Sequence, residues 1–202
     1  MPTPTAPDSR ELKSREEAWT LLTEYTKKPG LLKHALAVEA AMRAYAKKHN
    51  EDEQAWALVG LLHDFDYDRH PSLEEHPFVG AAELRRRGVS EEIVHAVLGH
   101  ADHTGVERRS DLDRGIYAVD EMVGFIVAVA LIRPSKSLLD LPAKSVTKKF
   151  KDKAFCRAVD RDHLRAAAAE IDIPLRDHVE NLIEDLRGIA PGLGLDGSAA
   201  EA

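Results

Sequence analysis

Apolar residues recur every three or four positions along most of the chain, which is the spacing of amphipathic helices. Ser14 and Glu17 form a capping box that begins one helix, and Pro29-Gly30 follows its end near residue 28. Asn50 with Glu53 is expected to begin a later helix. Further helices are predicted over residues 31–48, 50–64, 77–88, 90–100, 112–132, 143–150, 161–170 and 174–188. No alternating run flanked by turn residues marks a strand, so the pattern predicts an all-α protein.

Composition supports this fold class and suggests how the chain is organised. Ala, Leu, Glu, Lys and Arg are common and aromatic residues make up only 5%, a balance that favours helix over sheet. A length of 202 residues fits one domain. We expect a flexible N-terminus over residues 1–12 and a core over residues 13–135. A C-terminal extension of the same domain with short helices should cover residues 136–188, followed by a flexible tail rich in Pro, Gly, Ala and Ser over residues 189–202.

Charge and hydropathy exclude several classes of protein. The net charge of −7 argues against generic nucleic-acid binding. The longest apolar run, Met122 to Ile132, is too short to cross a bilayer, and the N-terminus lacks the pattern of a signal peptide. A single cysteine, Cys156, excludes an intrachain disulfide and fits a reducing cytoplasm. We therefore expect a soluble cytoplasmic protein with no membrane partner, and the sequence leaves a homo-oligomer open.

Four polar side chains interrupt helix faces that are otherwise apolar: His34, His63, Asp64 and Asp120. A buried carboxylate costs several kcal/mol unless it is paired, neutralised or bound to a metal. Asp120 has no cationic residue three or four positions away. Imidazole and carboxylate together suit Zn, Mn, Fe, Ni or Co better than Ca, and no nearby cysteine offers a thiolate site. Each histidine taken alone is also compatible with a hydrogen-bonded core residue.

The order of these residues resembles the HD superfamily of metal-dependent phosphohydrolases. The matching elements are His34, the adjacent His63-Asp64 in GLLHDFDYD, and Asp120 in YAVDEMVGF, with flanks that span about residues 31–135. The resemblance implies an HD-domain helical bundle that holds one or two divalent ions. These ions would be Mn, Fe, Zn, Ni or Co, and Mg also fits the family.

A two-metal subset of this superfamily carries two more histidines, and the segment HPFVGAAELRRRGVSEEIVHAVLGHADHTG looks like that subset. The resemblance implies that His76 and His100 complete a second metal position, with His103 as the alternative to His100. A cap before Pro77 is another role for His76, and a core position is another role for His100. The chain reads TGVERRSD after His103, without the Gly-Tyr-Pro signature of cyclic-dinucleotide phosphodiesterases, and is closer to small stand-alone HD-domain proteins. The remaining histidines are expected to be surface or structural residues: His49, His70, His95, His163 and His178.

The function implied by the resemblance is hydrolysis of a small phosphorylated metabolite or nucleotide by metal-activated water. Asp64 would bridge two metals, and Asp68 is the candidate general acid or base, with Asp66 second; both are alternatively solvated loop acids.

Basic residues follow the long helix. Arg133, Lys136 and Lys144 are candidates for binding the substrate phosphate, although a solvated helix face explains them equally. Two other functions stay open: a di-iron oxygenase of the same fold, and a non-catalytic HD domain that senses a nucleotide.

Overall fold

The computed structural model describes Leu12 and residues 14–198, and over these residues it confirms the all-α prediction. They form ten α-helices and one short 3-10 turn, without a strand. The elements are α1 (Arg15–Tyr25), α2 (Pro29–His49), α3 (Glu53–Leu62), α4 (Phe78–Arg86), α5 (Glu91–Gly99), η1 (Asp102–Thr104), α6 (Asp111–Leu131), α7 (Ala143–Lys149), α8 (Arg161–Glu170), α9 (Leu175–Arg187) and α10 (Ala190–Leu193).

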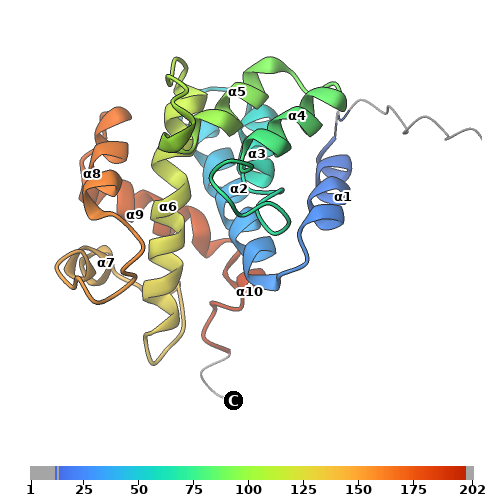
Figure 1. Ribbon diagram of the computed structural model, residues 1–202. Helices are drawn as coiled ribbons and strands as arrows, with labels where there is room; N and C mark the ends of the chain where they lie inside the picture. The colour runs from blue at the N-terminus through green and yellow to red at the C-terminus, as the bar shows by residue number, and fades with distance from the viewer. Residues whose placement is uncertain (1–11, 13, 199–202) are drawn as a thin grey trace, which may run out of the picture.

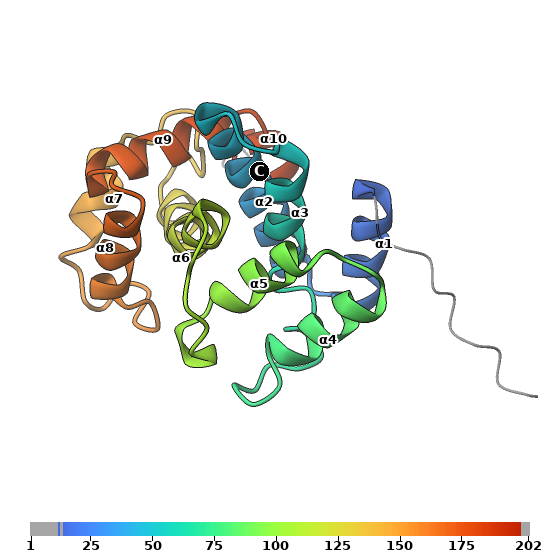
Figure 2. The same ribbon diagram turned by 90° about the horizontal axis from the view of Figure 1, so that it is seen from above.

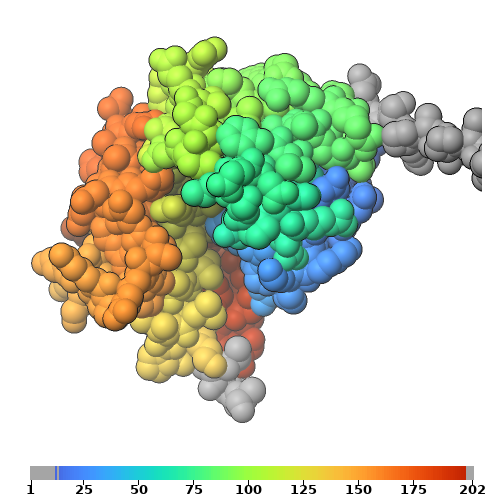
Figure 3. Space-filling model, in the orientation of Figure 1, coloured from blue at the N-terminus to red at the C-terminus, as the bar shows by residue number. Residues whose placement is uncertain are grey.

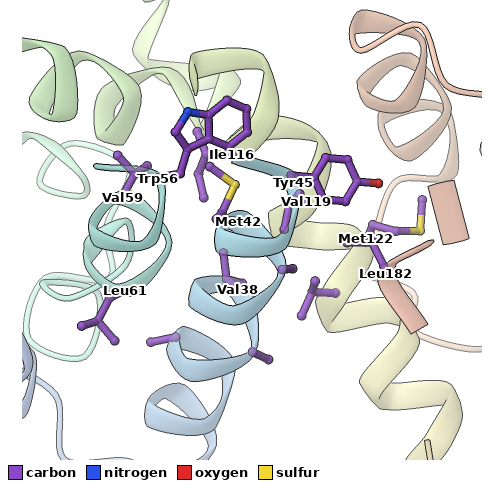
Figure 4. Close-up of a cluster of buried hydrophobic side chains, with 14 of the residues drawn as sticks. Val38, Met42, Tyr45, Trp56, Val59, Leu61, Ile116, Val119, Met122 and Leu182 are labelled. Atoms are coloured by element: carbon purple, nitrogen blue, oxygen red, sulfur yellow. The ribbon is translucent and has the colours of Figure 1, made fainter. Parts of the chain in front are cut away.

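Helix α6 is the central element, and it packs against α2, α3, α5, α7, α8 and α9. Figures 1 and 2 show α1 to α5 on one side of α6 and α7 and α8 on the other. A capping box fixes its start, because Ser110 Oγ accepts from the amide of Asp113 and Asp113 Oδ2 accepts from the amide of Ser110. Its buried residues Ile116, Val119 and Met122 meet side chains of α2, α3 and α9 in the core (Figure 4). Each such side chain contributes about 1.5–3 kcal/mol on burial.

Helices α2 and α3 pack backbone to backbone through Gly60. A Cβ atom at Gly60 would lie 2.9 Å from the Cα and the amide nitrogen of Glu39, closer than real Cβ contacts allow. Glycine therefore permits a helix separation that no other residue would permit. This close approach brings the start of α2 next to the end of α3, the two places where His34 and His63 lie.

The start of α3 differs from the sequence prediction. Asn50 closes α2 in the left-handed conformation, with φ of 60°. Asp52 is the N-cap of α3, and its Oδ1 accepts from the amides of Gln54 at 2.8 Å and Ala55 at 3.2 Å. The prediction that Asn50 begins α3 is wrong because asparagine serves both helix ends, and here it takes the C-terminal role.

The C-terminal segment also differs from the prediction. Residues 190–193 form α10, and Ala190, Leu193 and Leu195 are buried. The amide of Leu138 donates to the carbonyl of Leu195 at 2.8 Å, which fixes the segment against the loop after α6. The predicted flexible tail is therefore wrong up to residue 195. Burial of Leu193 and Leu195 stabilises this segment despite its Pro and Gly residues. Of the predicted N-terminal tail only Leu12 is described, and it is buried; the rest, like residues 199–202, lies outside the described residues.

Among the described helices, none combines the length and the apolar character that crossing a membrane would require.

Candidate metal centre

Six side chains from five parts of the chain converge beside α6. His34 lies in the second turn of α2, Asp120 lies in the middle of α6, and the adjacent His63 and Asp64 follow the end of α3. His76 precedes α4, and His100 caps α5. Their ligand atoms form two groups, each with all atoms within 4.8 Å of one another: His34, His63 and Asp120, and Asp64, His76 and His100. The structure thus brings together all six residues that the resemblance implied as ligands.

The first group is organised around Asp120. Its Oδ1 lies 2.8 Å from His34 Nε2 and 3.2 Å from His63 Nε2. His63 is completely buried, and its Nδ1 donates to the carbonyl of Gly60 at 2.9 Å, which leaves the lone pair on Nε2. That nitrogen makes no hydrogen bond to any described residue. A buried polar atom without a partner costs about 1–3 kcal/mol, and a cation between His63 and Asp120 would satisfy it.

The second group is organised around Asp64. Its Oδ1 lies 3.1 Å from His76 Nε2 and 3.4 Å from His100 Nε2. Its other oxygen, Oδ2, lies 3.6 Å from His63 Nε2 in the first group. The carboxylate of Asp64 therefore faces both groups.

Two buried contacts fix the ring orientation in the second group. Asp66 is completely buried; its Oδ1 accepts from His76 Nδ1 at 2.8 Å, and its Oδ2 accepts from the amide of Gly80 at 2.7 Å. Nδ1 of His100 donates to the carbonyl of Val97. In both rings the proton is held on Nδ1, so that Nε2 offers its lone pair to a metal. Asp66, the second candidate for a general acid, is thus a residue that orients His76.

The electrostatics of the cluster favour a bound cation. Burial acts to lower the pKa of His63, but the carboxylates of Asp120 and Asp64 outweigh it and raise the pKa to about 9. The pKa of His76 is also raised to about 9, because Asp64 and Asp66 outweigh burial in the same way. The pKa values of Asp64 and Asp120 lie below their usual range, because the facing imidazoles outweigh burial. Protons on the histidines thus compete for the position of a metal, and metal binding would displace them.

Comparison with known families agrees with this geometry. Residues 31–124 match the family model of the HD domain, and the match begins three residues before His34 and ends four residues after Asp120. This segment is an HD domain. HD domains form a superfamily of metal-dependent phosphohydrolases, and they bind divalent metals. No curated protein and no solved structure matches the chain.

Asp68 lies in the same loop of the HD domain and contacts the two residues that precede α2. Its Oδ2 accepts from the amides of Lys27 at 2.8 Å and Lys28 at 3.1 Å, and its Oδ1 lies 2.8 Å from Lys28 Nζ. These contacts lower the pKa of Asp68 to about 2. The carboxylate ties the loop to the start of α2 and stays ionised at neutral pH, which argues against Asp68 as a general acid. A role for Asp68 as a general base stays a prediction.

The predicted phosphate-binding residues do not join the centre. Arg133 lies two residues beyond Leu131, the last residue of α6, which is already about 17 Å along the helix axis from Asp120. Its Nη2 donates to Asp140 Oδ2 at 2.8 Å. Lys136 follows the end of α6 and Lys144 lies in α7, and both are exposed. The prediction of a phosphate clamp from these residues finds no support in their placement.

His103, the alternative ligand, also lies outside the two groups. It is exposed, and its Nε2 forms a hydrogen bond of 2.7 Å with the carbonyl of His76. The arrangement favours His100 over His103 as the ligand.

One acidic residue beside the centre was missed at the level of sequence. Glu121 directly follows Asp120, and its Oε2 is buried without a hydrogen bond to any described residue. Burial, together with the nearby carboxylate of Asp120, raises the pKa of Glu121, although His163 Nε2 lies 3.8 Å away. A second carboxylate next to Asp120 on an apolar helix was the signal that could have identified it.

Proposed function

We propose that the protein is a metal-dependent phosphohydrolase that acts on a small phosphorylated molecule, a metabolite or a nucleotide. The observation that carries the proposal is the buried Nε2 of His63, which makes no hydrogen bond to any described residue and lies between the carboxylates of Asp64 and Asp120. A hydrogen-bonded core histidine would use both ring nitrogens, as His178 does with Tyr45 and Ala118. The HD family membership supports hydrolysis as the chemistry.

Each residue has a separate task in the proposed mechanism. His34, His63 and Asp120 would hold one ion and His76 and His100 a second, with Asp64 shared between them. Bound divalent ions would lower the pKa of a water molecule and offset charge on a phosphoryl oxygen. Asp66 keeps the Nδ1 proton of His76 in place, so that this ring presents the same nitrogen throughout. The net charge of −7 would repel a phosphate, so the substrate needs local positive charge. Bound divalent ions would supply this charge at the centre.

The proposal is tested by measuring p-nitrophenol release from p-nitrophenyl phosphate and bis-p-nitrophenyl phosphate, and phosphate release from nucleoside monophosphates. The protein is stripped of metal and reloaded with Mn, Co, Zn, Fe or Mg under anaerobic conditions. We expect release only after reloading, and without oxygen. Removal of a residue that orients a metal ligand lowers activity by roughly 10–100-fold, and the loss of activity in Asp64→Ala should be larger than this. His70→Ala is the matched control, because His70 lies in the same loop and contacts the exposed Glu75.

Three outcomes would contradict the proposal. Equal hydrolysis by metal-free protein would exclude the metal mechanism. Oxygen-dependent turnover by the iron-loaded protein, without phosphate release, would favour a di-iron oxygenase. Nucleotide binding without turnover under any metal would favour a sensor.

A further inference from the structure

A cavity of about 510 Å³ adjoins the metal centre on the side of His34. It lies between the start of α2, the second half of α6 and the C-terminal segment. In Figure 3 this segment is the red surface between the blue of α2 and the yellow of α6. The walls of the cavity include Gly30, Gly124, Val127, Ala128, Leu131 and Leu195. Cavities of this size bind small molecules, and a protein partner would need a larger surface.

His34 belongs to both the metal centre and the cavity. Its Nε2 faces Asp120 at 2.8 Å, and its ring also lines the cavity. At Gly124, a Cβ atom would lie 3.8 Å from His34 Cε1 and 4.0 Å from its Nδ1. Because Gly124 has no side chain, nothing from this position stands between the ring and the cavity. A ligand bound at the metal centre could therefore extend directly into this space.

The chemistry of the walls selects the kind of ligand. Val127, Ala128 and Leu131 are apolar, and none of the described residues that line the cavity is acidic. Among the described lining residues Lys33 supplies an ammonium group, whose Nζ donates to the carbonyl of Leu193 at 2.7 Å. The polar edges of a nucleotide base would lose their hydrogen bonds to water against these walls, at a cost that an alkyl chain does not incur. The cavity thus suits an apolar group attached to an anion.

We propose that the substrate is a phosphate ester with an apolar arm, whose phosphate lies at the metal centre and whose arm lies in this cavity. This inference rests on the proposed phosphohydrolase function and narrows its substrate class. The arm would run along α6 from Gly124 to Leu131, about 10 Å of helix axis. Leu131 is 52% exposed, so it marks the open end, where a longer arm would reach solvent.

The test measures binding of methyl-, butyl- and octylphosphonate to the metal-loaded full chain by calorimetry. These probes carry the anion and the arm but cannot be hydrolysed. Each buried methylene is worth about fourfold in affinity, so butylphosphonate should bind at least about tenfold more tightly than methylphosphonate. Octylphosphonate should bind more tightly still. Equal affinity for the three probes would overturn the inference.

A matched pair of variants locates the arm. Leu131→Asp places a carboxylate at the open end of the cavity, and Ile132→Asp places one at the next residue, which is 55% exposed and does not line it. We expect Leu131→Asp to remove most of the gain from butyl to octyl and Ile132→Asp to retain it. Equal losses in the two variants would overturn the inference.

Hydrolysis of the corresponding alkyl phosphates is measured in parallel. Length-dependent binding without hydrolysis would support the cavity inference and refute the proposed function. Hydrolysis combined with a flat binding series would refute only the cavity inference.

Discussion

Replacing Asp66 by asparagine keeps the size of a completely buried side chain but removes its negative charge. Asp66 accepts from two donors, His76 Nδ1 at 2.8 Å and the amide of Gly80 at 2.7 Å. Asparagine has one carbonyl oxygen, so its amide group must face one of these donors. A Cβ atom at Gly80 would lie 2.8 Å from Asp66 Cγ, which shows how little room the new side chain has to turn away.

The expected magnitude follows from these two contacts. A buried donor left without an acceptor costs about 1–3 kcal/mol, which should appear as a lower free energy of unfolding of the metal-free protein. Loss of a residue that orients a metal-binding histidine costs about 10–100-fold in metal affinity, or about 1.4–2.7 kcal/mol. We therefore expect Asp66→Asn to weaken binding of one ion by that factor and to leave the group around Asp120 less affected.

The assay is a competition titration of Co or Zn against a chromophoric chelator, with urea unfolding of the metal-free variants. Asp68→Asn is the matched control, since it is the same change two residues along the loop, at a carboxylate that contacts Lys27 and Lys28. Equal metal affinity in the two variants would refute the role assigned to Asp66. If Asp68→Asn kept its metal but lost hydrolysis, Asp68 would be catalytic after all.

Three other outcomes are expected. Burial lowers the pKa of His178 to about 4 from an ordinary 6.5, so the folded state favours its neutral form. The resulting stability, about 3 kcal/mol, is present above pH 6.5 and is lost as pH falls toward 4; urea unfolding across this range should show the loss, and His178→Gln should reduce it. Gly60→Ala should lower the free energy of unfolding by about 1–3 kcal/mol and weaken metal binding. Gly30→Ala should change neither, because nothing lies within 4 Å of the added Cβ. Equal melting temperatures of the two variants would contradict this. His103→Ala should retain the full metal content by elemental analysis, and His100→Ala should not; the reverse result would exchange their roles.

The helices were predictable because apolar residues recur with helical spacing, and His34, His63, Asp64 and Asp120 because they interrupt that spacing. His76 and His100 were implied as ligands only by the resemblance to the HD superfamily. Asp120 is a carboxylate on an apolar helix face, and such a position has few explanations besides a cation. Asp66 and Asp68 were not distinguishable, because the loop that holds them has no periodicity to show which side chain turns inward.

The prediction of a flexible tail was wrong up to residue 195, and the prediction of a phosphate clamp finds no support; the sequence contained the reason in both cases. The rise of 1.5 Å per residue along α6 places Arg133 too far from Asp120 to share a phosphate with it. Leu193 and Leu195 lie in a segment rich in glycine. The glycine content led to the prediction of a flexible tail, although the fold buries both leucines.

The position of Asp64 between the two groups has a consequence for how related chains can diverge. Loss of His76 or His100 would leave His34, His63 and Asp120 intact, so a chain could pass from two ions to one by a single substitution. Loss of Asp64 would damage both positions at once, and no single replacement elsewhere would restore them. Among related HD domains we therefore expect the number of bound ions to vary through the two outer histidines, while the aspartate after His63 stays fixed.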